Sequence, residues 1–118
     1  MTKEEILAMK AGAELDYVVS QKVMGQGQEG LGFRTDYNNY STDISAAWQI
    51  VEKLILGYVF NLYFDDVGDC WVCKLFDGQQ EYRGYGTAPE AICKAALLAK
   101  TLEWKTASKH EPKAILSN

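Results

Sequence analysis

The chain has 118 residues, of which 47% are hydrophobic and 24% are charged, and it carries a net charge of −4. This size and composition are those of one globular domain that buries a core without disulfides or metals. The negative balance disfavours a polymeric nucleic acid as partner, because such binding needs many Lys and Arg side chains on phosphates, but it leaves room for a small anionic ligand.

The first 25 residues predict a helical segment with a break. Thr2 and Glu5 have the spacing of a capping box that starts a helix. Gly12 predicts a kink or short break, and Gly25 a C-terminal cap. The segment lacks the continuous apolar run of a signal peptide, and no run in the chain is long enough to span a bilayer. We therefore expect a cytoplasmic protein with no membrane partner.

Residues 25–30 read GQGQEG, which has the G-x-G-x-x-G spacing of a dinucleotide-binding fingerprint. That fingerprint requires a strand before the glycines and a helix opening after them. Here a predicted helix precedes the glycines and a loop follows, so we reject the dinucleotide-binding interpretation. The stretch is interpreted as a helix cap followed by a glycine-rich loop.

A second helix is predicted to start at Ser41 or Thr42, with Asp43 in its first turn, and to end at Gly57. Its apolar face is predicted to consist of residues at helical spacing, namely Ile44, Ala47, Trp48, Val51 and Ile55.

Three strands are predicted next, at residues 58–66, 70–76 and 79–86, with a two-residue turn at Asp77–Gly78. Thr87 and Glu90 form a second capping box, with Pro89 in the first turn of a last helix that reaches residue 105. The predicted fold class is α+β, a three-stranded antiparallel β-meander with helices packed on it in the order α-α-β-β-β-α. We expect a single domain of four parts, a helical segment 1–25, a glycine-rich loop 26–40, a core 41–107 and a short tail 108–118.

Residues suited to catalysis or metal binding are few. Cys70 and Cys73 lie three apart in a predicted strand and so point to opposite faces, which suits neither a metal site nor a redox pair. The only histidine is His110, in the tail. We therefore predict no enzyme activity, no cofactor and no metal site. A weaker alternative is an enzyme that uses the carboxylates of Asp65–Asp69 with a divalent cation.

The third predicted strand carries Tyr82, Arg83 and Tyr85 just before the helix that starts at Thr87. Arg83 and Tyr85 share one face of the strand. An arginine and an aromatic ring beside a helix N-terminus suit a phosphate attached to a base or ribose. The alternative is an ordinary exposed strand in which Arg83 pairs with Glu81 or Glu90, and the residues alone favour this alternative.

Three segments resemble the phage ABA sandwich domain, a family of small bacteriophage and prophage proteins, including those of Bacillus. They are MTKEEILAMKAGAELDYVVSQKVMG, YSTDISAAWQIVEKL and TAPEAICKAALLA. More distantly, the length and element order are similar to those of the Thoeris anti-defence sponges. Those phage proteins form homo-oligomers that sequester cyclic nucleotide signals of host immunity.

The resemblance implies a non-enzymatic phage anti-defence protein that binds and sequesters a cyclic ADP-ribose isomer or a cyclic oligonucleotide, with a homo-oligomer as the assembly. The ligand would lie between the glycine-rich loop of one subunit and the third strand or third helix of another. The candidate ligand-binding residues are Arg34, Tyr37, Tyr82, Arg83, Tyr85 and Thr87.

An alternative function is a protein–protein interaction module that inhibits a host defence protein. Its contact surface would be aromatic residues beside the glycine-rich loop, with Phe33, Tyr37 and Tyr40 expected to be exposed.

Overall fold

The computed structural model describes residues 2–25 and 38–101. Residues 88–101 are helical, and this element is called helix 88–101 below. The other elements are the helices α1 (Lys3–Ala8), α2 (Ala13–Lys22) and α3 (Ile44–Leu54) and the strands β1 (Val59–Asp65), β2 (Cys70–Phe76) and β3 (Glu81–Gly86). The α+β class and the order α-α-β-β-β-α are thus confirmed, with the broken N-terminal segment counted as one element.

Short-range polar contacts set where the helices begin. Thr2 and Glu5 form the predicted capping box, in which the Glu5 N–H donates to Thr2 Oγ1 over 3.1 Å and the Thr2 N–H donates to Glu5 Oε1 over 2.8 Å. Thr87 and Glu90 repeat this arrangement before helix 88–101, with both distances at 3.3 Å. Gly12 is the N-cap of α2 and separates it from α1. Its φ of 144° is one that glycine adopts without the strain a side chain would cause.

The three strands form one antiparallel sheet in the order β1-β2-β3. Leu62 pairs with Cys73, which pairs with Gly84, so these residues share the face that the helices cover. The two-residue turn predicted at Asp77–Gly78 is wrong, because the connection spans residues 77–80. Asp77 closes it, since its Oδ1 accepts from the N–H groups of Gln79 and Gln80.

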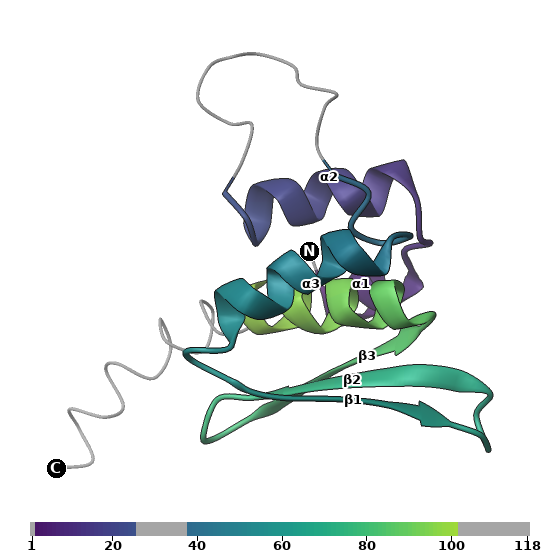
Figure 1. Ribbon diagram of the computed structural model, residues 1–118, viewed down its shortest axis with the longest axis vertical. Coiled ribbons are helices and arrows are strands. Elements are labelled where there is room, and N and C mark those ends of the chain that lie inside the picture. The colour runs from purple at the N-terminus through teal and green to yellow at the C-terminus, as the bar shows by residue number, and fades with distance from the viewer. Residues whose placement is uncertain (1, 26–37, 102–118) are drawn as a thin grey trace, which may run out of the picture.

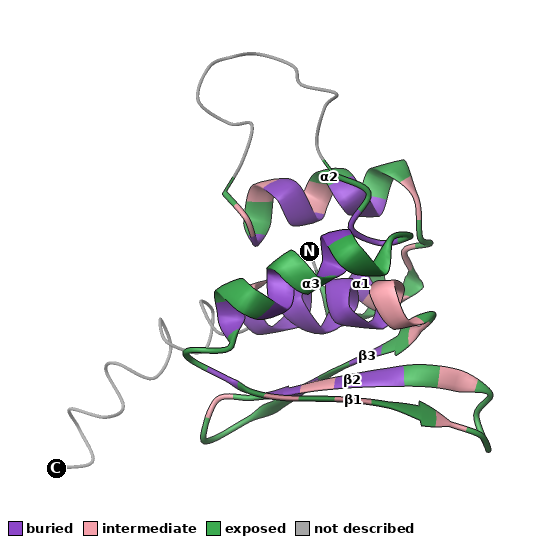
Figure 2. Cartoon of the chain, viewed as in Figure 1, coloured by how far each residue is buried: buried purple, intermediate pink, exposed green. Residues whose placement is uncertain are grey.

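All the described helices lie on one side of the sheet (Figure 1), and none of them is long and apolar enough to cross a membrane. Helix 88–101 runs directly over Gly84, where a side-chain carbon would stand 2.1 Å from the Ala91 carbonyl oxygen. On the β1 side, Trp48 of α3 meets Phe60 edge-on, with ring centroids 5.7 Å apart. The opposite face of the sheet carries no helix among the described residues (Figure 2).

The buried face of α3 differs from the prediction. Asp43 is the N-cap, and its side chain accepts from the Ser45 N–H over 2.9 Å, so the helix starts one or two residues later than expected. The residues that α3 buries are Ala46, Ala47, Ile50, Val51 and Leu54. Three residues assigned to the buried face are instead about half exposed, with values of 46% for Ile44, 44% for Trp48 and 52% for Ile55. The helix therefore presents an apolar stripe to solvent.

Candidate functional site

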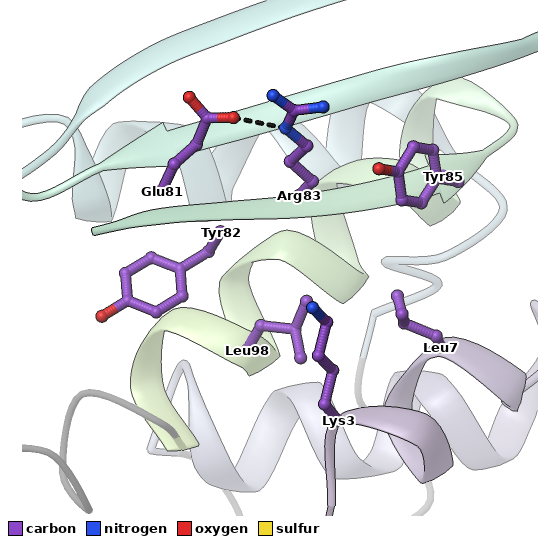
Figure 3. Close-up of a pocket in the computed structure, with 7 residues that line it drawn as sticks. All are labelled: Lys3, Leu7, Glu81, Tyr82, Arg83, Tyr85 and Leu98. Atoms are coloured by element: carbon purple, nitrogen blue, oxygen red, sulfur yellow. Dashed lines mark hydrogen bonds and ion pairs between the residues drawn. The ribbon is translucent and has the colours of Figure 1, made fainter.

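A pocket of about 290 Å³ opens along the edge of the sheet formed by β3. Among the described residues β3 pairs only with β2, so no other described strand pairs along its outer edge. Seven residues from β3, α1 and helix 88–101 line the pocket, namely Lys3, Leu7, Glu81, Tyr82, Arg83, Tyr85 and Leu98 (Figure 3). We call it the β3-edge pocket.

Strand geometry sorts the lining residues onto two sides. Successive side chains of a strand point to opposite faces, so Arg83 and Tyr85 lie on the open face and Tyr82 on the helix-covered face. Figure 3 shows Lys3 and Leu98 below β3 on the side of Tyr82, with the Lys3 ammonium pointing toward the strand. One cation therefore stands on each side of the strand edge. Lys3 was not predicted, because nothing in the sequence links the first turn of α1 to β3.

Arg83 forms an ion pair with Glu81 through its Nε atom. A hydrogen bond from Arg83 lowers the pKa of Glu81 below its usual value, and the same bond, followed by one to Tyr85, raises the pKa of Arg83. This is the Glu81 pairing that the alternative interpretation of the strand anticipated. A guanidinium has five N–H donors, so contacts at Nε do not exhaust its capacity to bind a phosphate.

Tyr82 forms a wall of the pocket and does not offer an accessible ring. It is 3% exposed, and its ring packs edge-on against Tyr58 with centroids 6.4 Å apart. Its hydroxyl donates to Asp77 Oδ2 over 3.2 Å. Tyr85 is 40% exposed and is therefore the pocket residue with an accessible aromatic surface.

The open face of the sheet extends the pocket with a third cation, Lys74, and a third tyrosine, Tyr63. Lys74 pairs with Arg83 across β2 and β3, and its ammonium lies 5.3 Å from the centre of the Tyr63 ring. In the next row, Val72 stands between Tyr63 and Tyr85 and is only 2% exposed. The two tyrosines, with Lys74 and Arg83 beside them, form what we call the tyrosine platform. Neither Lys74 nor Tyr63 is among the site residues predicted from the sequence.

Thr87, another predicted site residue, does not line the pocket. The Thr87 hydroxyl accepts from the Glu90 N–H, and the Glu90 carboxylate accepts from the Thr87 N–H. Glu90 also accepts from the Lys94 ammonium over 2.8 Å. The start of helix 88–101 is thus occupied by a carboxylate of the chain itself. Arg34 and Tyr37 lie outside the described residues.

Tyr40 was predicted to be an exposed contact residue, and this prediction is wrong, because Tyr40 is 0% exposed and belongs to the core. The neighbouring Ser41 fixes this segment to α2. Its N–H and its hydroxyl both donate to Asp16 Oδ1, each over 2.7 Å. The other residues proposed for that contact surface, Phe33 and Tyr37, lie outside the described residues.

In the part of the chain that the structure describes, no group of three or more His, Cys, Asp or Glu side chains is arranged to hold a metal ion. In the acidic hairpin, Asp65 Oδ1 accepts from the Val67 N–H over 3.1 Å, which is a turn contact. Cys70 and Cys73 point to opposite faces of β2, as predicted. Cys73 and Cys93 are buried, whereas Cys70 is partly exposed.

Burial predicts a single reactive thiol among the three cysteines. Burial raises the pKa of Cys73 to about 12, and it raises the pKa of Cys93 as well. The thiolate fraction of Cys73 at pH 8 is then about 10⁻⁴, against roughly one quarter for an ordinary thiol.

We expect iodoacetamide to alkylate Cys70 in the native protein, with Cys73 and Cys93 reacting at least about 100-fold more slowly. Peptide mapping by mass spectrometry measures the three rates. Labelling of all three in guanidinium is the control, and equal rates in native buffer would contradict the burial.

Comparison with known proteins places the chain in a family. The sequence model of the phage ABA sandwich domain matches residues 4–97. The chain belongs to the phage ABA sandwich domain family. The matched segment includes most of the residues that line the β3-edge pocket, while Lys3 and Leu98 lie immediately outside it.

A solved relative supports this assignment. The crystal structure of a phage protein from Bacillus cereus ATCC 14579, determined at 2.0 Å, superposes on this phage ABA sandwich domain with a TM-score of 0.63 at 29% sequence identity. The alignment covers 76% of this chain and 91% of the Bacillus protein. A search of curated proteins gave no match.

Proposed function

We propose that this phage ABA sandwich protein binds a phosphorylated nucleotide at the β3-edge pocket and acts by holding it rather than by converting it. The observation that carries the proposal is the convergence of Arg83, Lys3 and the accessible ring of Tyr85 on one strand edge. Arg and Lys provide charge for phosphate oxygens, and an aromatic face provides a stacking surface for a base.

The outer edge of β3, where no other described strand pairs, adds backbone hydrogen-bonding groups to this arrangement. An unpaired strand edge presents backbone N–H and C=O groups. These groups match the donors and acceptors on the edge of a nucleobase. A base between Lys3 and Tyr85 would therefore find polar partners, while its phosphate lies toward Arg83 on the open face.

The size of the site bears on the kind of nucleotide. Small-molecule pockets have volumes of about 300–1,000 Å³, so 290 Å³ is at the lower limit and suits one nucleotide unit. A ligand with a second unit would extend over the tyrosine platform, where Lys74 and Tyr63 repeat the pairing of a cation with a ring. This continuity favours a compact ligand with two phosphates, such as a cyclic ADP-ribose isomer or a cyclic oligonucleotide.

The phage family supports the biological part of the proposal. We propose that the protein sequesters a cyclic nucleotide signal of host immunity and thereby acts as an anti-defence protein. Retention needs binding groups alone, which the pocket supplies in the form of charge, a ring and a strand edge. Arg34 and Tyr37 stay predictions as additional ligand contacts.

Calorimetric titration with cyclic ADP-ribose isomers and with cyclic di- and trinucleotides tests the proposal. We expect one of these ligands to bind, and we expect Arg83→Gln to weaken it by about 10- to 100-fold because a charge-assisted hydrogen bond to phosphate is lost. Lys53→Gln is the matched control, because it removes one positive charge from an exposed position on α3, away from the pocket. Absence of heat with every ligand, or equal weakening by the two variants, would contradict the proposal.

A variant of Glu81 tests in the same titration whether the group held by Arg83 is negatively charged. A bound phosphate competes with the Glu81 carboxylate for Arg83, so Glu81→Gln is expected to strengthen binding several-fold. Protonation of Glu81 has the same effect, and because its pKa is lowered, this gain appears only at pH values below the usual range for glutamate. Weaker binding by Glu81→Gln would mean that the ligand is not an anion held by Arg83.

A further inference from the structure

The opposite edge of the sheet is formed by β1, the least buried of the three strands. None of the seven residues of β1 is buried, whereas β2 and β3 both contain buried residues. Among the described residues β1 pairs only with β2, so its outer edge presents unpaired N–H and C=O groups. Figure 2 shows β1 exposed or half-buried along its length.

Apolar side chains run beside this edge on the face that the helices otherwise cover. Trp48 packs on Phe60, and Phe64 meets Trp71 edge-on with ring centroids 5.6 Å apart. These side chains are still substantially exposed, by 44% for Trp48, 48% for Phe64 and 37% for Trp71. Ile44 and Ile55 continue the line along α3. We call the set the β1-edge strip, and its members are Ile44, Trp48, Ile55, Phe60, Phe64 and Trp71.

Natural edge strands usually carry features that prevent pairing with another chain, such as a lysine, a proline or a bulge. The sequence of β1, VFNLYFD, has neither lysine nor proline, and its pairing with β2 runs without interruption from Val59 to Asp65. Its one charge, on Asp65, is at the end of the strand. The edge is therefore open to a partner strand.

We propose that the β1 edge binds a second copy of this chain through an antiparallel β1–β1 pair, which continues the sheet to six strands. Symmetric pairing about Leu62 places Phe60 of each copy opposite Phe64 of the other. Both residues lie on the helix-covered face, so the pairing preserves the alternation of the two faces. The same patch serves both copies, which is the requirement for a two-fold interface.

The area available is adequate for a stable dimer. A fully buried aromatic side chain contributes about 150–250 Å², so the exposed parts of the β1-edge strip offer about 500 Å² per copy before the strand edge is counted. Standard interfaces bury about 800 Å² per partner, and strand backbone supplies the remainder. The strip consists of apolar side chains, which favours a protein partner over a nucleotide.

Sedimentation equilibrium of the full chain at about 1–100 µM tests the proposal. We expect twice the chain mass of 13.2 kDa for the wild type. Phe64→Lys is expected to raise the dimer dissociation constant by at least about 100-fold, because it places a charge opposite an apolar partner. Trp48→Ser, on α3, is expected to weaken the dimer by at least tenfold. Circular dichroism verifies that each variant is folded.

Phe76→Lys is the matched control, because Phe76 is 41% exposed on the open face of the central strand and lies outside the strip. It is expected to leave the dimer intact. A wild-type mass of one chain at 100 µM would overturn the proposal, as would equal effects of Phe64→Lys and Phe76→Lys. The pocket is at the other edge of the sheet, so ligand binding and dimer formation are tested independently.

Discussion

Replacing Gly84 with alanine is expected to lower the melting temperature of the protein by more than about 10 °C, or to prevent folding. Helix 88–101 crosses β3 at backbone contact distance. A side-chain carbon at Gly84 would stand 2.1 Å from the Ala91 carbonyl oxygen and 2.6 Å from the Ala95 nitrogen. Neither atom can move without displacing the helix.

The size of this loss of stability follows from the clash of the new side chain with backbone atoms rather than with side chains. Extra methylene groups in a packed core usually cost about 1–3 kcal/mol because side chains can adjust. Here the obstacle is backbone, so we expect a loss of at least about 3 kcal/mol, which is a large part of the 5–15 kcal/mol typical of a domain. Thermal unfolding followed by circular dichroism measures the loss.

Gly57→Ala is the control for the change of glycine to alanine. No atom lies within 4 Å of a side-chain carbon at Gly57, and its backbone is not in the left-handed region. We expect its melting temperature to stay within about 2 °C of the wild type. If Gly84→Ala were equally harmless, helix 88–101 would have to lie farther from β3 than the structure places it.

Replacing Asp16 with alanine is expected to cost about 3–5 kcal/mol of the free energy of unfolding. Asp16 is 3% exposed, and its Oδ1 accepts from both the backbone N–H and the hydroxyl of Ser41. The same hydroxyl accepts from the Gly12 N–H over 2.8 Å. Asp16 thus fixes the break before α2 to the segment that leads into α3. Its removal leaves a buried N–H of Ser41 without this acceptor.

Urea denaturation measures the loss in free energy of unfolding. Two further variants serve for comparison. Asp16→Asn keeps an amide oxygen that can accept one of the bonds, so we expect a smaller loss of about 1–2 kcal/mol. Asp43→Ala removes another aspartate, the exposed N-cap of α3, and should cost about 1 kcal/mol. Equal losses for Asp16→Ala and Asp43→Ala would show that burial of the Asp16 contacts contributes nothing.

Some residues of the candidate site could be predicted from a local sequence pattern, and others could not. The alternation of β3 was sufficient to place Arg83 and Tyr85 on one face and Tyr82 on the other, because side-chain direction in a strand depends only on parity. Lys3 could not be anticipated at the pocket, since it comes from the first helix of the chain, far from β3 in sequence. Thr87 was a reasonable candidate for an anion site, but Glu90 occupies that position in its capping box.

By itself, the sequence determined the elements and their order. Capping boxes at Thr2 and Thr87, the break at Gly12 and the alternation of the strands act over one to four residues, so they can be identified without a fold. Only the tertiary structure decided which surfaces are covered. The helical spacing of α3 allowed Trp48 as a core residue, but in the fold it packs on Phe60 of the edge strand β1 and stays 44% exposed. The contact between Lys94 and the Leu7 carbonyl oxygen joins residues 87 positions apart. Burial depends on such distant contacts, and no local pattern encodes them.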